Sequence, residues 1–108
     1  AMRPQAVPVN MYETAAALVI LAPMVAVTAD DVCVEFKPGM VRFWAHLRSA
    51  GTRDYLIHEW EYGGYERCID IPPGFGRAVE ASLGNGQLAI RILRGDPAAP
   101  LTVKPTAL

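Results

Sequence analysis

The sequence contains few of the residues that most often carry chemistry. Its 108 residues include two cysteines and two histidines, and the formal net charge is −1. A net charge so close to zero gives no electrostatic reason to expect nucleic acid or an anionic membrane as a partner. The longest apolar run, Ala15 to Val27, contains Pro23 and is shorter than the roughly 20 residues of a membrane-spanning helix. The N-terminus also lacks a signal-peptide pattern, so we expect a cytoplasmic protein.

Motifs of the common catalytic and metal sites are missing as well. Cys33 and Cys68 lie far apart with no Cys-x-x-Cys spacing, so we expect two reduced, packed thiols. His46 and His58 have no metal-ligand spacing, and no Gly-x-Ser-x-Gly segment is present to hold a serine nucleophile. Gly84-Asn85-Gly86 precedes no helical pattern that could bind a phosphate. The sequence therefore predicts that the protein is no enzyme and uses no metal or cofactor.

A β-hairpin is the clearest feature that the sequence does contain. Apolar residues recur at every second position on both arms, which places each set on one face of a strand: Val79, Ala81 and Leu83, then Leu88, Ile90 and Ile92. Asn85 and Gly86, between the arms, tolerate the positive φ of a tight hairpin turn. The residues between the apolar positions are mostly polar, which is typical of an antiparallel sheet with one solvated face.

The other strand-like segments surround this hairpin and are separated by turn residues. They are residues 9–13, 17–22, 32–37, 41–47, 55–60 and 65–71. Residues 17–22 are apolar with little alternation, which indicates a strand covered on both sides or lying at a subunit contact. No segment shows a helical period longer than one or two turns. The pattern predicts an all-β fold, an immunoglobulin-like antiparallel β-sandwich of about seven or eight strands in one domain.

The order of these segments resembles the α-crystallin domain of the small heat-shock proteins. The hairpin is similar to the family's Ala-x-Leu-x-Asn-Gly-x-Leu-x-Ile signature, with Gln87 where the family usually has valine. The segment from Gly63 to Arg67 resembles the start of the next family strand, and Leu101-Thr102-Val103 looks like the family's aliphatic-x-aliphatic anchor. The resemblance implies a short N-terminal segment (residues 1–8), an α-crystallin domain (residues 9–93) and a C-terminal extension (residues 94–108).

The resemblance also implies where the sites of such a protein would lie. A dimer-forming strand would consist of Tyr55, Leu56, Ile57, His58, Glu59 and Trp60 and would add to the partner's sheet beside residues 9–13. Arg67 matches an interface arginine, which we expect to be partly buried and paired with a carboxylate. An apolar groove would lie between two sets of residues: Val32, Val34 and Phe36, and Val79, Ala81 and Leu83. We expect Leu101 and Val103 to dock into that groove on a neighbouring molecule, because Pro97 and Pro100 keep the spacer extended.

The function that this resemblance implies is that of an ATP-independent chaperone, a holdase of the stress response. Its partners would be itself, as a homodimer or a larger oligomer, and unfolding client proteins. An apolar groove suits this role because apolar burial is non-directional and demands no particular client sequence. The alternatives are a co-chaperone module of the CS-domain kind, with the same architecture and one folded partner, and a small sugar-binding or adhesin sandwich.

Overall fold

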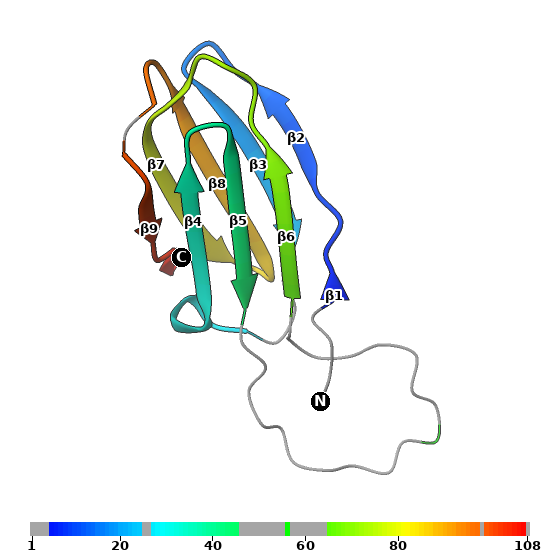
Figure 1. The fold of residues 1–108 in the computed structure, drawn as a ribbon. Coiled ribbons are helices and arrows are strands. Elements are labelled where there is room, and N and C mark those ends of the chain that lie inside the picture. The colour runs from blue at the N-terminus through cyan, green and yellow to red at the C-terminus, as the bar shows by residue number, and fades with distance from the viewer. Residues whose placement is uncertain (1–4, 25–26, 46–55, 57–64, 98, 108) are drawn as a thin grey trace.

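A computed structural model describes residues 5–24, 27–45, 56, 65–97 and 99–107. These residues form two five-stranded sheets that pack as a β-sandwich (Figure 1). Sheet A has the order β1-β6-β5-β4-β9 and sheet B has the order β10-β7-β8-β3-β2. The strands are β1 (Gln5–Ala6), β2 (Asn10–Glu13), β3 (Ala17–Pro23), β4 (Val32–Lys37), β5 (Met40–Ala45), β6 (Tyr65–Asp70), β7 (Phe75–Gly84), β8 (Gln87–Arg94), β9 (Leu101–Val103) and β10 (Thr106–Ala107). The predicted all-β sandwich is confirmed.

The inward faces of the two sheets make one apolar core. Alternate residues of β4 and β5 in sheet A meet alternate residues of β3 and β8 in sheet B, and the largest fully buried side chains are Phe36, Phe43, Leu18, Ile20, Met24, Leu88, Ile90 and Ile92. Each such side chain contributes about 1.5–3 kcal/mol by leaving water. This core is what holds the strands of the two sheets, and therefore their edges, in fixed positions.

The hairpin has the turn that its sequence predicts. Gly84 pairs with Gln87, which leaves Asn85 and Gly86 as the two turn residues with φ of 53° and 72°. Both values are positive, as a type I′ turn requires, and asparagine and glycine adopt them at low cost. The arms are longer than predicted, because β7 begins at Phe75 and β8 ends at Arg94.

The non-alternating strand β3 is buried on both of its faces, one of the two possibilities that its sequence left open. Leu18 and Ile20 point into the core, whereas Val19 belongs to the opposite face and is still only 6% exposed. Tyr12 on β2 and Arg91 on β8 flank Val19 in register. The neighbouring strands of the same chain therefore account for the apolar residue on the outer face.

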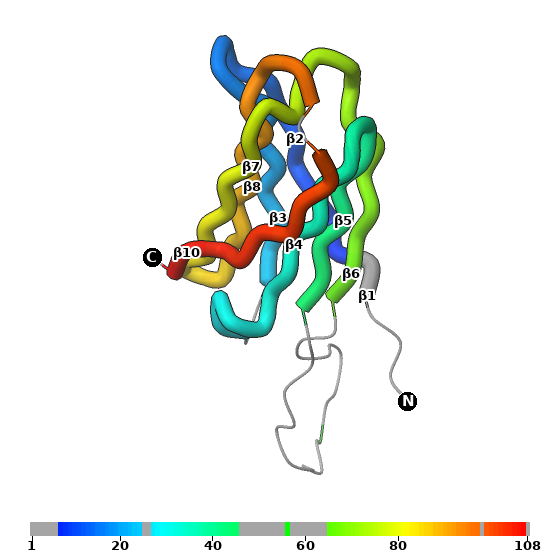
Figure 2. The backbone as a smooth tube through the Cα atoms, turned by 60° about the vertical axis from the view of Figure 1, so that its left-hand side comes forward, coloured from blue at the N-terminus to red at the C-terminus, as the bar shows by residue number. Residues whose placement is uncertain are grey.

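Segments near the two ends of the chain supply the outermost strands of both sheets. Near the N-terminus, β1 pairs in parallel with β6 of sheet A, and β2 then pairs with β3 of sheet B. Near the C-terminus, β9 pairs with β4 of sheet A, and β10 then pairs in parallel with β7 of sheet B. Figure 2 shows the second crossing, in red, over the edge between β4 and β7. Strands β1 and β10 were not predicted, because two residues are too few to show a period, and β9 was expected only as a segment that docks into another molecule.

Candidate functional site

The expected apolar groove lies where β4 of sheet A approaches β7 of sheet B. On the β4 side Val32, Val34 and Phe36 have no exposed surface. On the β7 side Leu83 is 7% exposed, and Val79 and Ala81 are partly buried and pack against the core. The six residues proposed from the sequence are thus brought together along one edge of the sandwich.

The groove is occupied by the C-terminal segment of the same chain. Leu101 pairs with Phe36 and Val103 pairs with Val34, so β9 extends sheet A beyond β4. The side chains of Leu101 and Val103 pack against the core, whereas Thr102 between them is exposed. The sequence led us to expect docking in a neighbouring molecule, but in this structure the segment folds back onto its own β4.

Residues beyond Val103 attach the segment a second time. The Lys104 ammonium group donates a hydrogen bond to the Asp30 carbonyl oxygen at 2.8 Å, and Pro105 is buried. Thr106 then pairs with Ser82 in the edge of sheet B. Residues 101–107, which we call the C-terminal strap, therefore join the two sheets across the groove.

The chain enters the strap through a close contact at the start of β7. Gly76 has a φ of 131°, and a β-carbon at this position would lie 2.5 Å from Phe36 Cζ and 3.1 Å from Pro97 Cα. Glycine is the residue that allows this backbone conformation and this approach. The positions of Phe36 in the groove wall and of Pro97 in the spacer therefore require a residue without a side chain at position 76.

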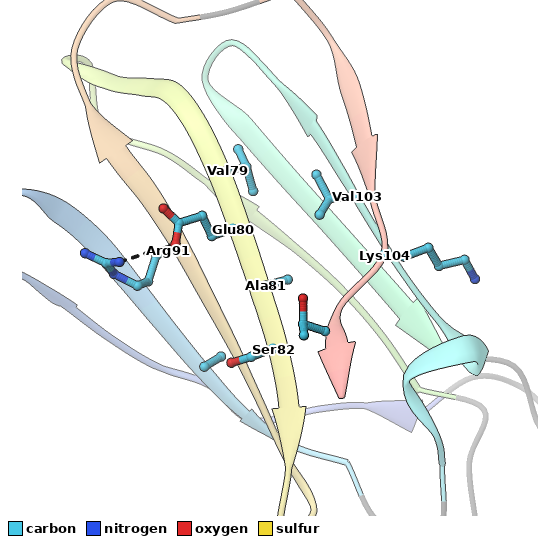
Figure 3. Close-up of a pocket in the computed structure, with 9 residues that line it drawn as sticks. Val79, Glu80, Ala81, Ser82, Arg91, Val103 and Lys104 are labelled. Atoms are coloured by element: carbon cyan, nitrogen blue, oxygen red, sulfur yellow. Dashed lines mark hydrogen bonds and ion pairs between the residues drawn. The ribbon is translucent and has the colours of Figure 1, made fainter. Parts of the chain in front are cut away.

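The strap also borders a cavity that none of the β4 groove residues line. A cavity of about 410 Å³ lies between the strap and β7 and β8 (Figure 3). Its lining combines apolar residues with charged and hydroxyl groups: Val79, Glu80, Ala81, Ser82, Ala89, Arg91, Val103, Lys104 and Thr106. Arg91 Nη1 and Glu80 Oε2 are 3.4 Å apart and form an exposed ion pair at its margin. Of the six groove residues only Val79 and Ala81 line this cavity, which therefore adjoins the groove on the side of β7.

Among the described residues, Arg67 contacts a backbone carbonyl group, and the carboxylate pair expected of it stays a prediction. Its Nη1 donates a hydrogen bond to the Val7 carbonyl oxygen at 3.0 Å, and its side chain is half-buried on β6. The neighbouring carboxylate of Glu66 instead binds Arg42 on β5, through Nε at 3.2 Å and through Nη2. The hydrogen bond to Glu66 raises the pKa of the Arg42 guanidinium, which also stacks 4.3 Å above the Trp44 ring.

The structure describes the strand edge that would accept a second copy, but only one residue of the expected dimer strand. Of the predicted strand, Tyr55, Ile57, His58, Glu59 and Trp60 lie outside the described residues, and Leu56 is fully exposed. The accepting edge, β2, is described, and all four of its residues are exposed. Met11 and Tyr12 keep 44% and 49% of their surface accessible. An exposed strand edge with apolar side chains is a template for pairing with another chain.

Arg94, the last residue of β8, makes a contact that the sequence did not predict. Its Nη2 and Nε donate hydrogen bonds to the carbonyl oxygens of Thr14 and Ala15, at 3.2 Å and 3.3 Å. These carbonyl groups belong to the turn that joins β2 to β3. No signal in the sequence pointed to this contact, because an arginine at the end of a strand is more often solvated.

The two cysteines are free thiols on the outer side of sheet A. Cys33 is partly buried, but Cys68 is exposed, so the prediction that both are packed is wrong for Cys68. Cys68 alternates with inward-facing residues on a strand whose outer face meets water.

Among the residues that the structure describes, no three of His, Cys, Asp and Glu gather as metal ligands, and no helix has the length and apolarity to cross a membrane.

Comparison with solved structures shows that the fold is that of small heat-shock proteins. HSP18.5 from E. histolytica superposes with a TM-score of 0.73 at 12% identity over 87% of this chain and 92% of its own. HspA from Xanthomonas axonopodis gives 0.73 at 21% identity over 87% and 98% of the two chains. A small heat-shock protein from Xylella fastidiosa gives 0.71 at 20% identity over 91% and 94%. No protein-family model and no curated protein sequence matches this chain.

Proposed function

We propose that this protein is an ATP-independent holdase that binds exposed apolar segments of unfolding proteins and keeps them from aggregating. The observation that carries the proposal is the apolar groove between β4 and β7, covered by a strap of the same chain. The fold, which the chain shares with solved small heat-shock proteins, supports it. Holding a client in such a groove needs no bond to be made or broken, so the proposal includes no catalytic step. A cytoplasmic location and a role in the stress response belong to the same proposal.

The energetics of the strap favour its exchange for a client segment. Burying Leu101 and Val103 completely would contribute about 3–6 kcal/mol, and both side chains are only partly buried. Ordering the strap costs conformational entropy that offsets this gain. The strap stays in place because the contacts of Lys104, Pro105 and Thr106 add to those of the two anchors, and because a segment of the same chain has a high effective concentration at its own groove. An apolar client segment at sufficient concentration can replace it.

In this proposal the protein acts as a homodimer. The exposed edge of β2 would accept residues 55–60 of a second copy, whose apolar and aromatic composition suits Met11 and Tyr12. Strand addition of this kind satisfies the backbone groups of an open edge and covers apolar side chains. A strap that leaves its own groove can also enter that of a neighbour, which would join dimers into larger assemblies.

The test is the suppression of light scattering from a heat-denatured client, with and without nucleotide. The proposal predicts that this protein lowers the scattering at near-equimolar ratios and that ATP makes no difference. A co-chaperone module that recruits one folded partner would not lower the scattering, which would equal that of the client without added protein. Scattering that stays at the level of an inert protein control would contradict the proposal.

A further inference from the structure

The strand at the outer edge of sheet B, β2, has no buried side chain of its own. All four residues from Asn10 to Glu13 are exposed, and the strand pairs with β3 through its backbone. Strands gain stability mainly by packing side chains on a half-buried surface. Because β2 lacks such a surface, other contacts are needed to hold it in place.

Two arginines from other strands hold the chain on either side of β2. Arg67 on β6 donates to the carbonyl oxygen of Val7, three residues before the strand begins. Arg94 on β8 donates to the carbonyl oxygens of Thr14 and Ala15, directly after the strand ends. Hydrogen bonds from a charged donor are stronger than those between neutral groups. The two contacts therefore fix both approaches to β2 without touching its outer edge.

Arg94 is itself held in position. Its guanidinium lies 4.5 Å above the ring of Phe75, which is 2% exposed. Its backbone N–H donates to the Ala16 carbonyl oxygen at 2.8 Å. Arg94 thus binds three consecutive carbonyl groups of the turn between β2 and β3. The hydroxyl oxygen of Thr14 accepts the Ala17 N–H at 3.0 Å and closes the same turn.

We propose that Arg94, acting with Arg67, is a positioning residue for dimer formation that holds β2 as a preformed edge for a second copy of this chain. The inference rests on the dimer proposed above. Among the four outer strands β2 is the longest, with four residues against two or three. We take a second copy as its occupant because residues 55–60 of the chain are apolar and aromatic and suit the exposed Met11 and Tyr12. An edge that is ordered before association loses less conformational entropy on binding, which strengthens the dimer.

Three variants distinguish the loss of the hydrogen bonds that position β2 from the loss of an arginine elsewhere on the same strand. Arg94→Met removes the donors to Thr14 and Ala15 and keeps an apolar side chain over Phe75. Arg94→Lys keeps the charge but replaces the planar fork by a point donor. Arg91→Met is the matched control, because Arg91 lies on the same strand and is paired with Glu80 on β7, not with the turn between β2 and β3.

Two measurements are made on each full-length variant. Hydrogen exchange of the amides of residues 10–13 is followed at a dilution where monomers prevail, and the dimer dissociation constant is taken from mass as a function of concentration. For Arg94→Met we expect exchange about tenfold faster and a dissociation constant about tenfold higher. Arg94→Lys should lie between Arg94→Met and the wild type, and Arg91→Met should match the wild type.

The outcomes distinguish failure of this inference from failure of the proposed dimer. If Arg94→Met leaves the hydrogen exchange of residues 10–13 unchanged, Arg94 does not hold β2 in place and the inference is wrong. Faster exchange with an unaltered dissociation constant would overturn its role in dimer formation. A wild-type protein that remains monomeric at all concentrations would overturn the dimer itself, and this inference with it.

Discussion

Val103 pairs with Val34 at the edge of β4, so the chain fills its own groove with the residues expected to fill a neighbour's. The relationship changes what the C-terminal segment does in the proposed mechanism. A segment that docks in its own molecule competes with clients for the groove. Its release, and not only its capture by a second molecule, would then control activity.

Replacing both anchor residues of the strap should open the groove. With Leu101→Ser and Val103→Ser, the two apolar side chains packed against the core are lost, whereas the strands behind them keep their own contacts. We expect higher fluorescence of a dye that binds apolar surfaces and the loss of any assembly larger than a dimer. Thr102→Ser, at the exposed position between them, is the control and should change neither. Equal dye binding in the double variant and the wild type would show that the strap does not cover the groove.

Gly76→Ala should destabilise the edge of the sandwich more than a change at another glycine with positive φ. The new β-carbon would overlap Phe36 and press on Pro97, in addition to the backbone strain. We expect a loss of about 2–4 kcal/mol from the two effects together. Gly74→Ala is the control, with a φ of 94° and no atom within 4 Å of its β-carbon, and should lose about 1–2 kcal/mol. The comparison of melting temperatures checks this, and equal losses would mean that Phe36 and Pro97 yield freely.

Arg67→Ala should lower stability by leaving the Val7 carbonyl group without its described donor. Val7 is 2% exposed, so water has poor access to that oxygen. An unsatisfied buried acceptor costs about 1–3 kcal/mol. Arg91→Ala removes an exposed ion pair and should cost at most about 1 kcal/mol. Chemical denaturation of the two variants measures the difference, and an Arg67→Ala protein as stable as Arg91→Ala would argue against the Val7 contact.

Much of the sandwich could be predicted because its signals are local. The alternation in β4 and β8 and the Asn85-Gly86 turn between the hairpin arms depend on residues within ten positions of one another. The apolar pattern of residues 17–22 likewise indicated either burial on both faces or a subunit contact, and the structure shows the first. In the alternating strands β4 and β8, the side chains themselves indicate which face points into the core.

The contacts that hold the chain on either side of β2 could not be predicted, because they join residues far apart in the sequence. Arg67 and Val7 are 60 positions apart, and the acceptor is a backbone carbonyl group that any residue type supplies. Arg94 and Thr14 are 80 positions apart and have the same character. For the strap, the pattern of Leu101 and Val103 predicts two inward side chains but cannot tell which molecule supplies the groove.

The central claim is that the groove beneath the strap holds clients, and a reversible lock on the strap tests it most directly. Glu35 and Thr102 are direct partners between β4 and β9, so cysteines placed there lie at a separation that suits a disulfide. The lock combines Glu35→Cys and Thr102→Cys with serine at the two native cysteine positions, and light scattering from a heat-denatured client is measured in the oxidised and reduced states. We predict that the oxidised protein fails to suppress scattering and that reduction restores suppression. An oxidised protein that suppresses scattering as well as the reduced one would contradict the account.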